Sequence, residues 1–134
     1  MTANRKITIL GSTGSIGEST LDVVNRHPDR FQVFALTANK NVTKMLSQCQ
    51  RFQPRYAVML NSESAEQLSK AIQAANINTE VLSGIESLEK VASHPEVDAV
   101  MAAIVGAAGI RPTFAAARTG KLVLLANKET LVMA

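Results

Sequence analysis

A glycine-rich stretch near the start of the chain limits most strongly what the chain can fold into. Residues 6–20 read KITILGSTGSIGEST, with Gly11, Gly14 and Gly17 following an apolar run at a spacing of three. The apolar run predicts a strand, and the residues from Ser15 onward predict a helix. In a glycine-rich turn between a strand and a helix, the backbone can come close to a phosphate, and the positive end of the helix faces the anion. The stretch therefore predicts a phosphate-binding turn.

Each glycine of this turn has its own expected role. Gly11 makes the tight turn after the strand, Gly14 allows a close approach of the ligand, and Gly17 lets the helix pack on the sheet. The hydroxyl groups expected to donate to phosphate oxygens are those of Ser12, Thr13 and Ser15. The spacing G-x-x-G-x-x-G is a longer variant of the dinucleotide fingerprint, and it lacks the lysine of a nucleoside-triphosphate loop. A dinucleotide is therefore favoured over a nucleoside triphosphate, and a turn without a ligand is the alternative.

Strands and helices are predicted to alternate along the chain. The predicted strands cover residues 6–10, 31–37, 55–60, 79–82, 97–104 and 121–126, and the predicted helices cover residues 15–26, 42–52, 62–76, 85–93 and 110–118. Most of these strands are apolar on both faces, which is typical of a parallel sheet covered by helices on both sides. The expected fold is therefore α/β, a doubly wound, mostly parallel and Rossmann-like sheet in three α/β/α layers.

The strand-to-helix loops of such a sheet lie on one edge, because crossovers are right-handed, and ligands bind at that edge. The loops expected there cover residues 11–17, 37–41, 104–109 and 126–129. The second loop holds no acidic residue for a ribose 2′-hydroxyl, and Lys40 stands there instead, between Asn39 and Asn41. A cation and neutral donors suit a 2′-phosphate, so NADP(H) is favoured over NAD(H). An exposed loop lysine without a ligand is the alternative.

The fourth loop carries three consecutive polar residues. Asn127, Lys128 and Glu129 in LLANKET follow a predicted buried strand. Polar residues at this place either begin a helix or form a reactive cluster at the ligand edge. The pattern by itself leaves both interpretations open.

Composition and charge exclude several other classes of protein. The chain has 134 residues, enough for one domain with a core, and a net charge of +3 from scattered basic residues, which argues against nucleic-acid binding. A single cysteine allows neither an intrachain disulfide nor a cysteine-based zinc site. No run of about 18 apolar residues predicts a membrane span, and the short polar N-terminus predicts no signal peptide. We expect a soluble, cytoplasmic protein.

Three residues with reactive side chains are expected to be structural. His27 and His94 each precede a proline at the end of a predicted helix, where such a residue suits the helix terminus. Cys49 lies on the apolar face of the predicted helix over residues 42–52, so we expect it in the core. No serine of the glycine loop is matched by the histidine and aspartate of a catalytic triad.

Five segments together resemble a known family. They read ILGSTGSIG, KNVT, PRYAVM, VMAAIVGAAG and LLANKE, and they are similar to the N-terminal NADPH-binding domain of the 1-deoxy-D-xylulose 5-phosphate reductoisomerase family. The glycine loop alone is weakly specific, whereas its combination with AAIVGAAG and LANKE in this order is strongly so. The resemblance covers nearly the whole chain.

The resemblance implies a role for residues at each loop. The positions that match contacts to the cofactor pyrophosphate are Thr13, Gly14, Ser15 and Ile16, and those that match the loop at the 2′-phosphate are Asn39, Lys40 and Asn41. Asn127 and Glu129 match cofactor contacts near the nicotinamide, Lys128 matches a substrate contact, and residues 102–105 would line the cofactor cleft. Many members have glycine where Asn39 stands, and asparagine tolerates left-handed backbone better than most residues.

The resemblance also implies a reaction. The family converts 1-deoxy-D-xylulose 5-phosphate to 2-C-methyl-D-erythritol 4-phosphate in the non-mevalonate isoprenoid pathway. A divalent metal, Mg²⁺ or Mn²⁺, acts as Lewis acid and template for the rearrangement, and NADPH delivers a hydride. The metal ligands of the family are carboxylates beyond the LANKE strand, so we expect no metal ligand and no catalytic residue before Ala134.

At the level of the whole chain, the resemblance predicts one domain. Residues 1–134 would be the NADPH-binding, N-terminal part of a longer homodimeric enzyme, without its metal-binding, catalytic and C-terminal domains. Such a part is expected to bind NADPH and not to turn over substrate by itself. The strand order 3-2-1-4-5 is taken over as an inference at the level of the family.

Two alternatives from other functional classes stay open. One is a module that senses CoA or a nucleotide without chemistry, because similar glycine loops hold CoA phosphates. The other is a different NADP-linked reductase or semialdehyde dehydrogenase with the same glycine spacing. An affinity for CoA that equals that for NADPH would favour the first, and a catalytic cysteine in further sequence would favour the dehydrogenase.

Overall fold

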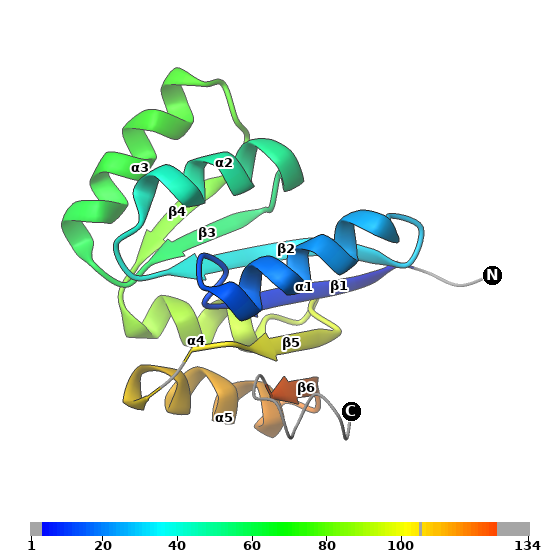
Figure 1. The fold of residues 1–134 in the computed structure, drawn as a ribbon. Coiled ribbons are helices and arrows are strands. Elements are labelled where there is room, and N and C mark those ends of the chain that lie inside the picture. Colours follow the sequence, from blue (N-terminus) through cyan, green and yellow to red (C-terminus); the bar gives the residue numbers. More distant parts are fainter. Residues whose placement is uncertain (1–3, 105, 126–134) are drawn as a thin grey trace.

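The predicted alternation of strands and helices forms a single parallel sheet with its crossover helices (Figure 1). The computed structural model describes residues 4–104 and 106–125. Its strands are β1 (Arg5–Leu10), β2 (Phe31–Ala38), β3 (Tyr56–Met59), β4 (Glu80–Ser83), β5 (Ala99–Ala102) and β6 (Leu122–Leu125). Its helices are α1 (Ser15–Arg26), α2 (Val42–Phe52), α3 (Ser62–Ala74), α4 (Ile85–Ser93) and α5 (Ile110–Arg118), with a 3₁₀ turn η1 (Ala107–Gly109). The bounds of α1, α2, α4 and α5 agree with the predicted ranges.

The six strands of the described part are parallel, in the order β4-β3-β2-β1-β5-β6. This confirms the predicted doubly wound fold. The expected order 3-2-1-4-5 is wrong, because β4 pairs with β3 and β5 takes the place beside β1. The order of the strands depends on which face of the sheet each crossover helix packs against. The backbone hydrogen bonds between strands are the same for every residue type, so they do not select a neighbour. The sequence of β4 therefore did not indicate its neighbour.

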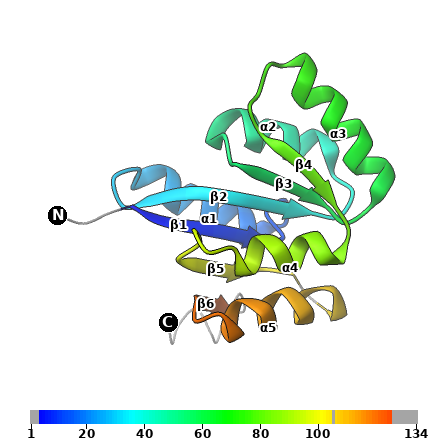
Figure 2. The ribbon, with the colours of Figure 1, turned by 180° about the vertical axis from the view of Figure 1, so that it is seen from behind.

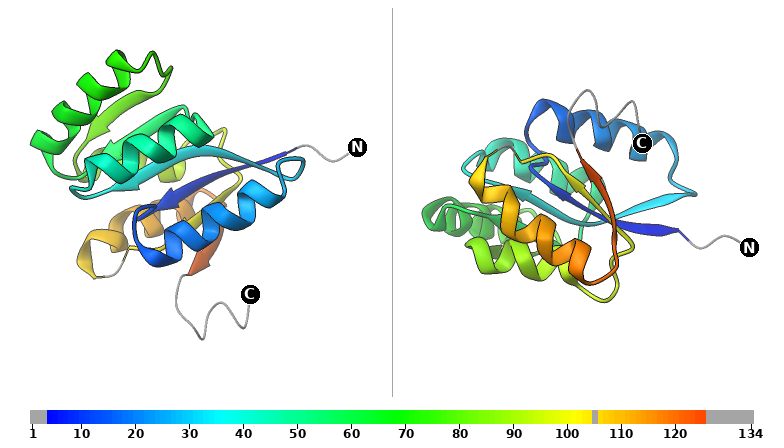
Figure 3. Two further views of the ribbon diagram at one scale, coloured as in Figure 1. Left: turned by 45° about the horizontal axis from the view of Figure 1, so that its top comes forward. Right: turned by 90° about the horizontal axis from the view of Figure 1, so that it is seen from below.

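Helices cover both faces of the sheet, as expected for strands that are apolar on both sides. Figures 1 and 3 show α1, α2 and α3 on one face and α4 and α5 on the other. Leu21, Met45 and Leu68 belong to the core on the first face, and Leu88 and Ala116 belong to the core on the second. Figure 2, seen from behind, shows α4 and α5 side by side. The three predicted layers are confirmed.

Successive residues of one strand contribute to different cores. In β1, Ile9 is fully buried on the side of α1 and α2, and its neighbour Leu10 is fully buried on the side of α4. Thr8 is buried as well, and its hydroxyl donates to the carbonyl oxygen of Val91 in α4 at 2.9 Å. Side chains of the two cores fill both faces of the central strands. A ligand therefore finds room at the loops where these strands end.

The carboxyl ends of β1, β2 and β5 meet at one edge of the sheet, and the strand order reverses between β1 and β5. In open α/β sheets, ligands bind at such a reversal, because the loops that leave the two strands go to opposite faces. The loop after β5, predicted over residues 104–109, contains the 3₁₀ turn η1. This edge holds the first three predicted loops.

Candidate functional site

The first glycine of the loop adopts the left-handed backbone that its predicted turn requires. Gly11 has a φ of +85°, and a Cβ atom there would lie 3.0 Å from the carbonyl oxygen of Ala103 after β5. Gly14 has an ordinary φ of −80° and is the residue before α1. Apart from the residues next to it in the chain, a Cβ atom on Gly14 would meet one atom within 4 Å, the carbonyl oxygen of Gly11 at 3.9 Å. The side of the loop at Gly14 is therefore open to a ligand.

The third glycine packs more closely than predicted, and against a different group. A Cβ atom on Gly17 would lie 2.2 Å from the carbonyl oxygen of Gly11 and 2.6 Å from Cα of Ser12. Gly17 thus lets α1 rest on the backbone of its own loop, whereas the sequence predicted contact with the sheet. The two glycines at the ends of the motif hold the loop in one shape.

One of the three hydroxyl groups expected to bind phosphate is committed inside the protein. Ser12 is fully buried, and its Oγ donates to the carbonyl oxygen of Thr37 at 3.2 Å. That prediction is wrong for Ser12, because the loop folds back onto the end of β2. Ser15 is exposed and Thr13 is half-buried, so their side chains lie at the surface.

Thr37 at the end of β2 joins the first two predicted loops. Its Oγ1 accepts from the N–H of Gly11 at 2.9 Å, and its carbonyl oxygen accepts from the N–H of Ser12 at 2.8 Å. The glycine loop therefore lies next to the loop over residues 39–41. Thr37 is the first residue of the predicted loop over residues 37–41, but the sequence did not predict these bonds.

Two side chains of α2 reach back to the glycine loop, and the sequence analysis missed both. Gln48 donates from Nε2 to the carbonyl oxygen of Ser12 at 2.8 Å, and Lys44 donates from Nζ to that of Thr13 at 3.2 Å. Lys44 also forms an ion pair with Glu18 of α1 at 2.7 Å. The available signal was Gln48 itself, a polar residue on the apolar face of an amphipathic helix, one turn after a lysine.

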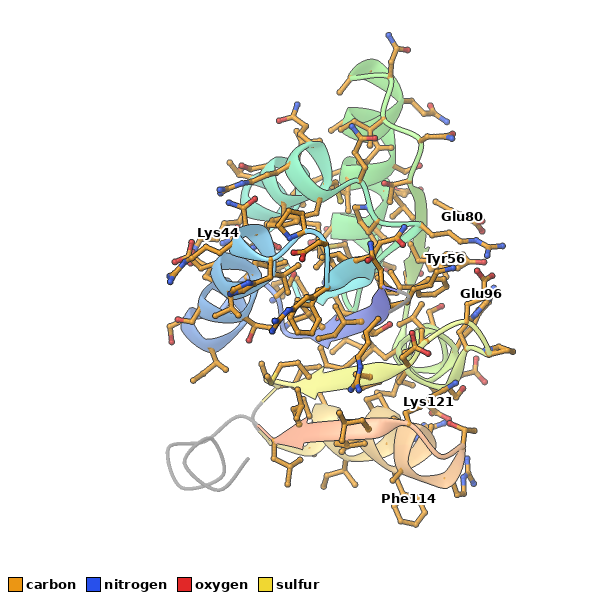
Figure 4. All side chains as sticks on the ribbon, turned by 90° about the vertical axis from the view of Figure 1, so that its right-hand side faces the viewer. Lys44, Tyr56, Glu80, Glu96, Phe114 and Lys121 are labelled. Carbon is orange, nitrogen blue, oxygen red and sulfur yellow. The ribbon has the colours of Figure 1, made fainter. Side chains whose placement is uncertain are left out.

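These side chains lie in a groove of about 470 Å³ between α1 and α2. The groove is lined by Glu18, Ser19, Leu21, Asp22, Lys44, Ser47, Gln48, Arg51 and Phe52. Figure 4 shows Lys44 on the side of the sheet that carries α1 and α2, across the sheet from Glu96. The groove adjoins the glycine loop, because Lys44 and Gln48 both line it and bond to carbonyl groups of that loop.

The start of α1 presents backbone donors at the candidate site. Gly14 is the N-cap, and no side chain caps the helix. The first N–H groups of a helix have no partner within the helix, and the helix dipole makes this end favourable for an anion. The side chain of Ile16 faces an apolar groove of about 350 Å³ that Val23, Met101 and Leu124 also line. Ile16 can therefore meet an anion through its backbone N–H.

The loop after β2 is exposed and carries a cation. Lys40 is exposed, and the described residues place no carboxylate at ion-pair distance from it. Asn41 caps α2 by accepting from the N–H of Lys44 at 3.1 Å, which leaves its amide nitrogen as a donor. Apart from glycines, only Gln53 and Asn76 of the described residues have a positive φ. Asn39 therefore needs no left-handed backbone, and its replacement of glycine carries no strain.

The remaining predicted site residues fall in two groups. Asn127, Lys128 and Glu129 lie outside the described residues, as does Val105. Residues 102–104 are half-buried at the end of β5, where the N–H of Ala103 donates to the carbonyl oxygen of Leu10 at 2.8 Å. The structure therefore brings the glycine loop, the Lys40 loop and the end of β5 together.

The predicted positions of Cys49, His27 and His94 are confirmed. Cys49 is fully buried, and burial raises the pKa of its thiol to about 12, so the reactive thiolate does not form near neutral pH. His27 and His94 follow the last residues of α1 and α4 as C-caps. Across residues 4–104 and 106–125, no group of three or more His, Cys, Asp or Glu side chains is arranged to hold a metal ion. No helix in these ranges is both long and apolar enough to cross a membrane.

Comparison with known sequences gives one consistent result. A family model described as 1-deoxy-D-xylulose 5-phosphate reductoisomerase matches residues 7–134. A relative of that name from Nitrosomonas eutropha is 74% identical over 134 residues, which are 100% of this chain and 32% of the relative. One from Nitrosospira multiformis is 73% identical over the whole chain and 34% of its own length. The chain spans about a third of the length of these curated relatives.

Solved structures give the same result for the fold. A crystal structure of DOX-P reductoisomerase in complex with NADPH, fosmidomycin and magnesium is 47% identical, with a TM-score of 0.88 over 97% of this chain and 32% of that protein. The 1-deoxy-D-xylulose 5-phosphate reductoisomerase from Zymomonas mobilis in complex with NADPH is 44% identical, with a TM-score of 0.87 over 98% of this chain and 34% of that one.

Proposed function

The chain belongs to the 1-deoxy-D-xylulose 5-phosphate reductoisomerase family, and we propose that it is the NADPH-binding part of such an enzyme. The observation that carries the proposal is the junction at Thr37, which binds the glycine loop through Gly11 and Ser12 and lies three residues before Lys40. One continuous surface at the sheet edge thus offers backbone donors and, next to them, a cation. In a dinucleotide with a 2′-phosphate, the pyrophosphate would meet the backbone donors, and the 2′-phosphate would meet the cation.

The glycine loop and the start of α1 fit a pyrophosphate. We assign its contacts to Thr13, Gly14, Ser15 and Ile16, whose backbone N–H groups lie at the uncapped end of α1. The open side at Gly14 supports this assignment, because a phosphate needs close access to the backbone.

The loop after β2 fits a 2′-phosphate. We assign this contact to Asn39, Lys40 and Asn41, which are all exposed at the same edge. A cation that the described carboxylates leave without an ion pair is available to a phosphate, and an acidic residue that would select a ribose 2′-hydroxyl is absent from the loop. The loop therefore supports NADPH over NADH.

The chemistry of the whole enzyme is also part of the proposal. Bound NADPH would supply the hydride for reduction of 1-deoxy-D-xylulose 5-phosphate after its rearrangement. By their match to the family, Asn127 and Glu129 would contact the cofactor near the nicotinamide, and Lys128 would contact the substrate. The divalent metal, Mg²⁺ or Mn²⁺, would be held by carboxylates outside this chain. We place the enzyme in the cytoplasm and expect it to be a homodimer.

Calorimetric titration of this chain with NADPH, NADH and CoA at one fixed salt concentration tests the proposal. We expect NADPH to bind more tightly than NADH and CoA. Lys40→Glu is expected to weaken the binding of NADPH by roughly 10- to 100-fold, because a charged hydrogen bond is worth about 1.5–3 kcal/mol. The affinity for NADH should stay nearly unchanged. Lys70→Glu, the same charge change on the exposed surface of α3, is the matched control.

Each other outcome has a defined meaning. Binding of CoA as tight as that of NADPH would favour the sensing module. A folded chain that binds none of the three ligands would contradict the proposal. If Lys40→Glu lowered the affinities for NADPH and NADH equally, the assignment of the 2′-phosphate to this loop would be wrong.

A further inference from the structure

Two consecutive carbonyl groups of the glycine loop are held from the same side. The carbonyl of Ser12 accepts from Gln48, and the carbonyl of Thr13 accepts from Lys44. Both donors lie on α2, one turn apart. The glycine loop is therefore fastened to the neighbouring helix by its acceptor groups.

The geometry of the peptide bond turns this attachment into an orientation of donors. In a trans peptide, the C=O of one residue and the N–H of the next point in opposite directions, and the described residues contain no cis peptide. The bond from Gln48 thus directs the N–H of Thr13 away from α2. The bond from Lys44 does the same for the N–H of Gly14. These two donors precede the donors of Ser15 and Ile16 at the start of α1.

We propose that Gln48 and Lys44 are positioning residues, which aim the N–H groups of Thr13 and Gly14 at the cofactor pyrophosphate. The inference rests on the proposed NADPH function and adds to it residues that do not touch the ligand. The two oriented N–H groups would add to those of Ser15 and Ile16 at the uncapped start of α1, which gives four consecutive donors over residues 13–16. Without the two bonds, these peptide planes can rotate, and the loop offers carbonyl oxygens to the phosphates in part of its conformations.

The burial of Gln48 supports a role beyond packing. Its side chain is 9% exposed, and its Oε1 is buried without a hydrogen-bond partner. A buried acceptor that is not satisfied is costly, so an apolar side chain would suit this position in the core better. The bond from Nε2 to Ser12 is the contact that a methionine of similar size would lose.

Lys44 has a second effect, through charge. Glu18 stands in the first turn of α1, where its carboxylate opposes a bound phosphate. Lys44 pairs with that carboxylate at 2.7 Å and brings its own positive charge to the back of the loop. Removal of Lys44 therefore frees a carbonyl and exposes an unpaired negative charge beside the phosphate site.

The experiment compares Gln48→Met and Lys44→Met with the unmodified chain. Gln50→Met, the same change at an exposed position of α2, is the matched control for Gln48. Lys44→Arg keeps a charged donor and serves as the conservative variant. Each variant is titrated with NADPH and with adenosine 2′-monophosphate, which carries the 2′-phosphate but no pyrophosphate. Amide chemical shifts of Thr13 and Gly14 are followed by NMR on addition of inorganic pyrophosphate.

We expect Gln48→Met and Lys44→Met each to raise the Kd for NADPH by roughly 5- to 15-fold, the effect of one hydrogen bond, with less than a twofold change for adenosine 2′-monophosphate. The pyrophosphate-induced shifts at Thr13 and Gly14 decrease in both variants and are kept in Gln50→Met and Lys44→Arg. Adding Glu18→Gln to Lys44→Met recovers part of the affinity for NADPH.

Two results would overturn the positioning role while the NADPH function stands. One is unchanged affinity for NADPH in both variants, and the other is an equal loss for NADPH and adenosine 2′-monophosphate. If the unmodified chain binds no NADPH, the proposed function fails. The pyrophosphate measurement then tests separately whether the N–H groups of Thr13 and Gly14 are aimed at a phosphate. The absence of shifts at Thr13 and Gly14 in the unmodified chain would overturn the orientation itself.

Discussion

At the scale of single residues, the three glycines of the loop meet different physical constraints. Gly11 is required by its positive φ and by the close carbonyl of Ala103. Gly17 is required by distance alone, because the backbone of Gly11 and Ser12 occupies the place of a Cβ atom. Gly14 has neither constraint, and its small size matters only when a ligand approaches. Stability and binding can therefore be separated within one motif.

Gly17→Ala and Gly14→Ala should separate these effects. Gly17→Ala is expected to lower the free energy of unfolding by about 3 kcal/mol or more, because α1 must move away from its loop. Gly14→Ala should change the free energy of unfolding by less than about 1 kcal/mol and weaken NADPH binding. Urea denaturation measures the first quantity and calorimetric titration the second. Equal stability of the two variants would contradict the close packing of α1.

At the scale of elements, an ion-pair and aromatic cluster joins the amino ends of the strands, opposite the candidate site. Glu96 pairs with Lys6 of β1 at 3.0 Å and with Arg55 before β3. The ring of His94 lies 4.7 Å from that of Phe34 and 6.0 Å from that of Tyr56. Figure 4 shows Tyr56 and Glu96 near each other at this end. The cluster fastens the end of α4 to the sheet.

The state of His94 should make this attachment sensitive to acid. Its Nδ1 accepts from the N–H of Glu96 at 3.1 Å, so the ring is neutral in this arrangement. Burial is the largest cause that lowers the pKa of His94 below its ordinary value of 6.5, against the opposite effect of Glu96. Further contributions that lower it come from Arg55, Lys90 and Lys121. The unfolded chain thus binds more protons than the folded chain just below pH 6.5.

Because the unfolded chain binds more protons at His94, we expect the free energy of unfolding to fall as the pH is lowered from 6.5 toward 5. The pKa of Glu96 is also lowered from 4.5, chiefly by its hydrogen bond from Lys6, so its loss of stabilisation begins at lower pH. Urea denaturation at pH 7.5, 6.5 and 5.5 measures the slope in the range where His94 contributes. His94→Gln should flatten the slope. An unchanged slope in His94→Gln would contradict the assignment.

At the scale of the whole molecule, the proposed site joins parts of the chain that come from two strands and two helices. The glycine loop after β1, the Lys40 loop after β2 and the donors of α2 form it together. A ligand that binds only the folded arrangement of these elements stabilises the whole chain by mass action. Binding can therefore be measured through unfolding.

NADPH at about 100 times its Kd should raise the free energy of unfolding by about 2.7 kcal/mol. NADH at the same concentration should raise it by less, since it lacks the 2′-phosphate. Thermal or urea denaturation with each cofactor makes the measurement, and Lys40→Glu should remove the difference between them. Equal stabilisation by both cofactors would contradict the selectivity of the Lys40 loop.

Much of this architecture follows from patterns that are local in the chain. Apolar runs predicted the strands, and the spacing of apolar residues predicted four helices to the residue, because burial on one face repeats every 3.6 residues. The glycine spacing and the basic loop after β2 predicted the kind of ligand. These signals depend on residues that are close in sequence, so no knowledge of the tertiary contacts was needed.

Other features depend on contacts between residues that are distant in sequence, and only the tertiary structure decided them. The place of β4 beside β3 depends on helix packing across the sheet, because the backbone ladder accepts any neighbour. Ser12 is a buried donor to Thr37 because two loops meet, although its sequence context suggests a phosphate contact. The bonds of Gln48 and Lys44 to the glycine loop span 36 and 31 residues. The residue types of the site could thus be predicted from the sequence, whereas the direction in which the backbone donors point is set by tertiary contacts.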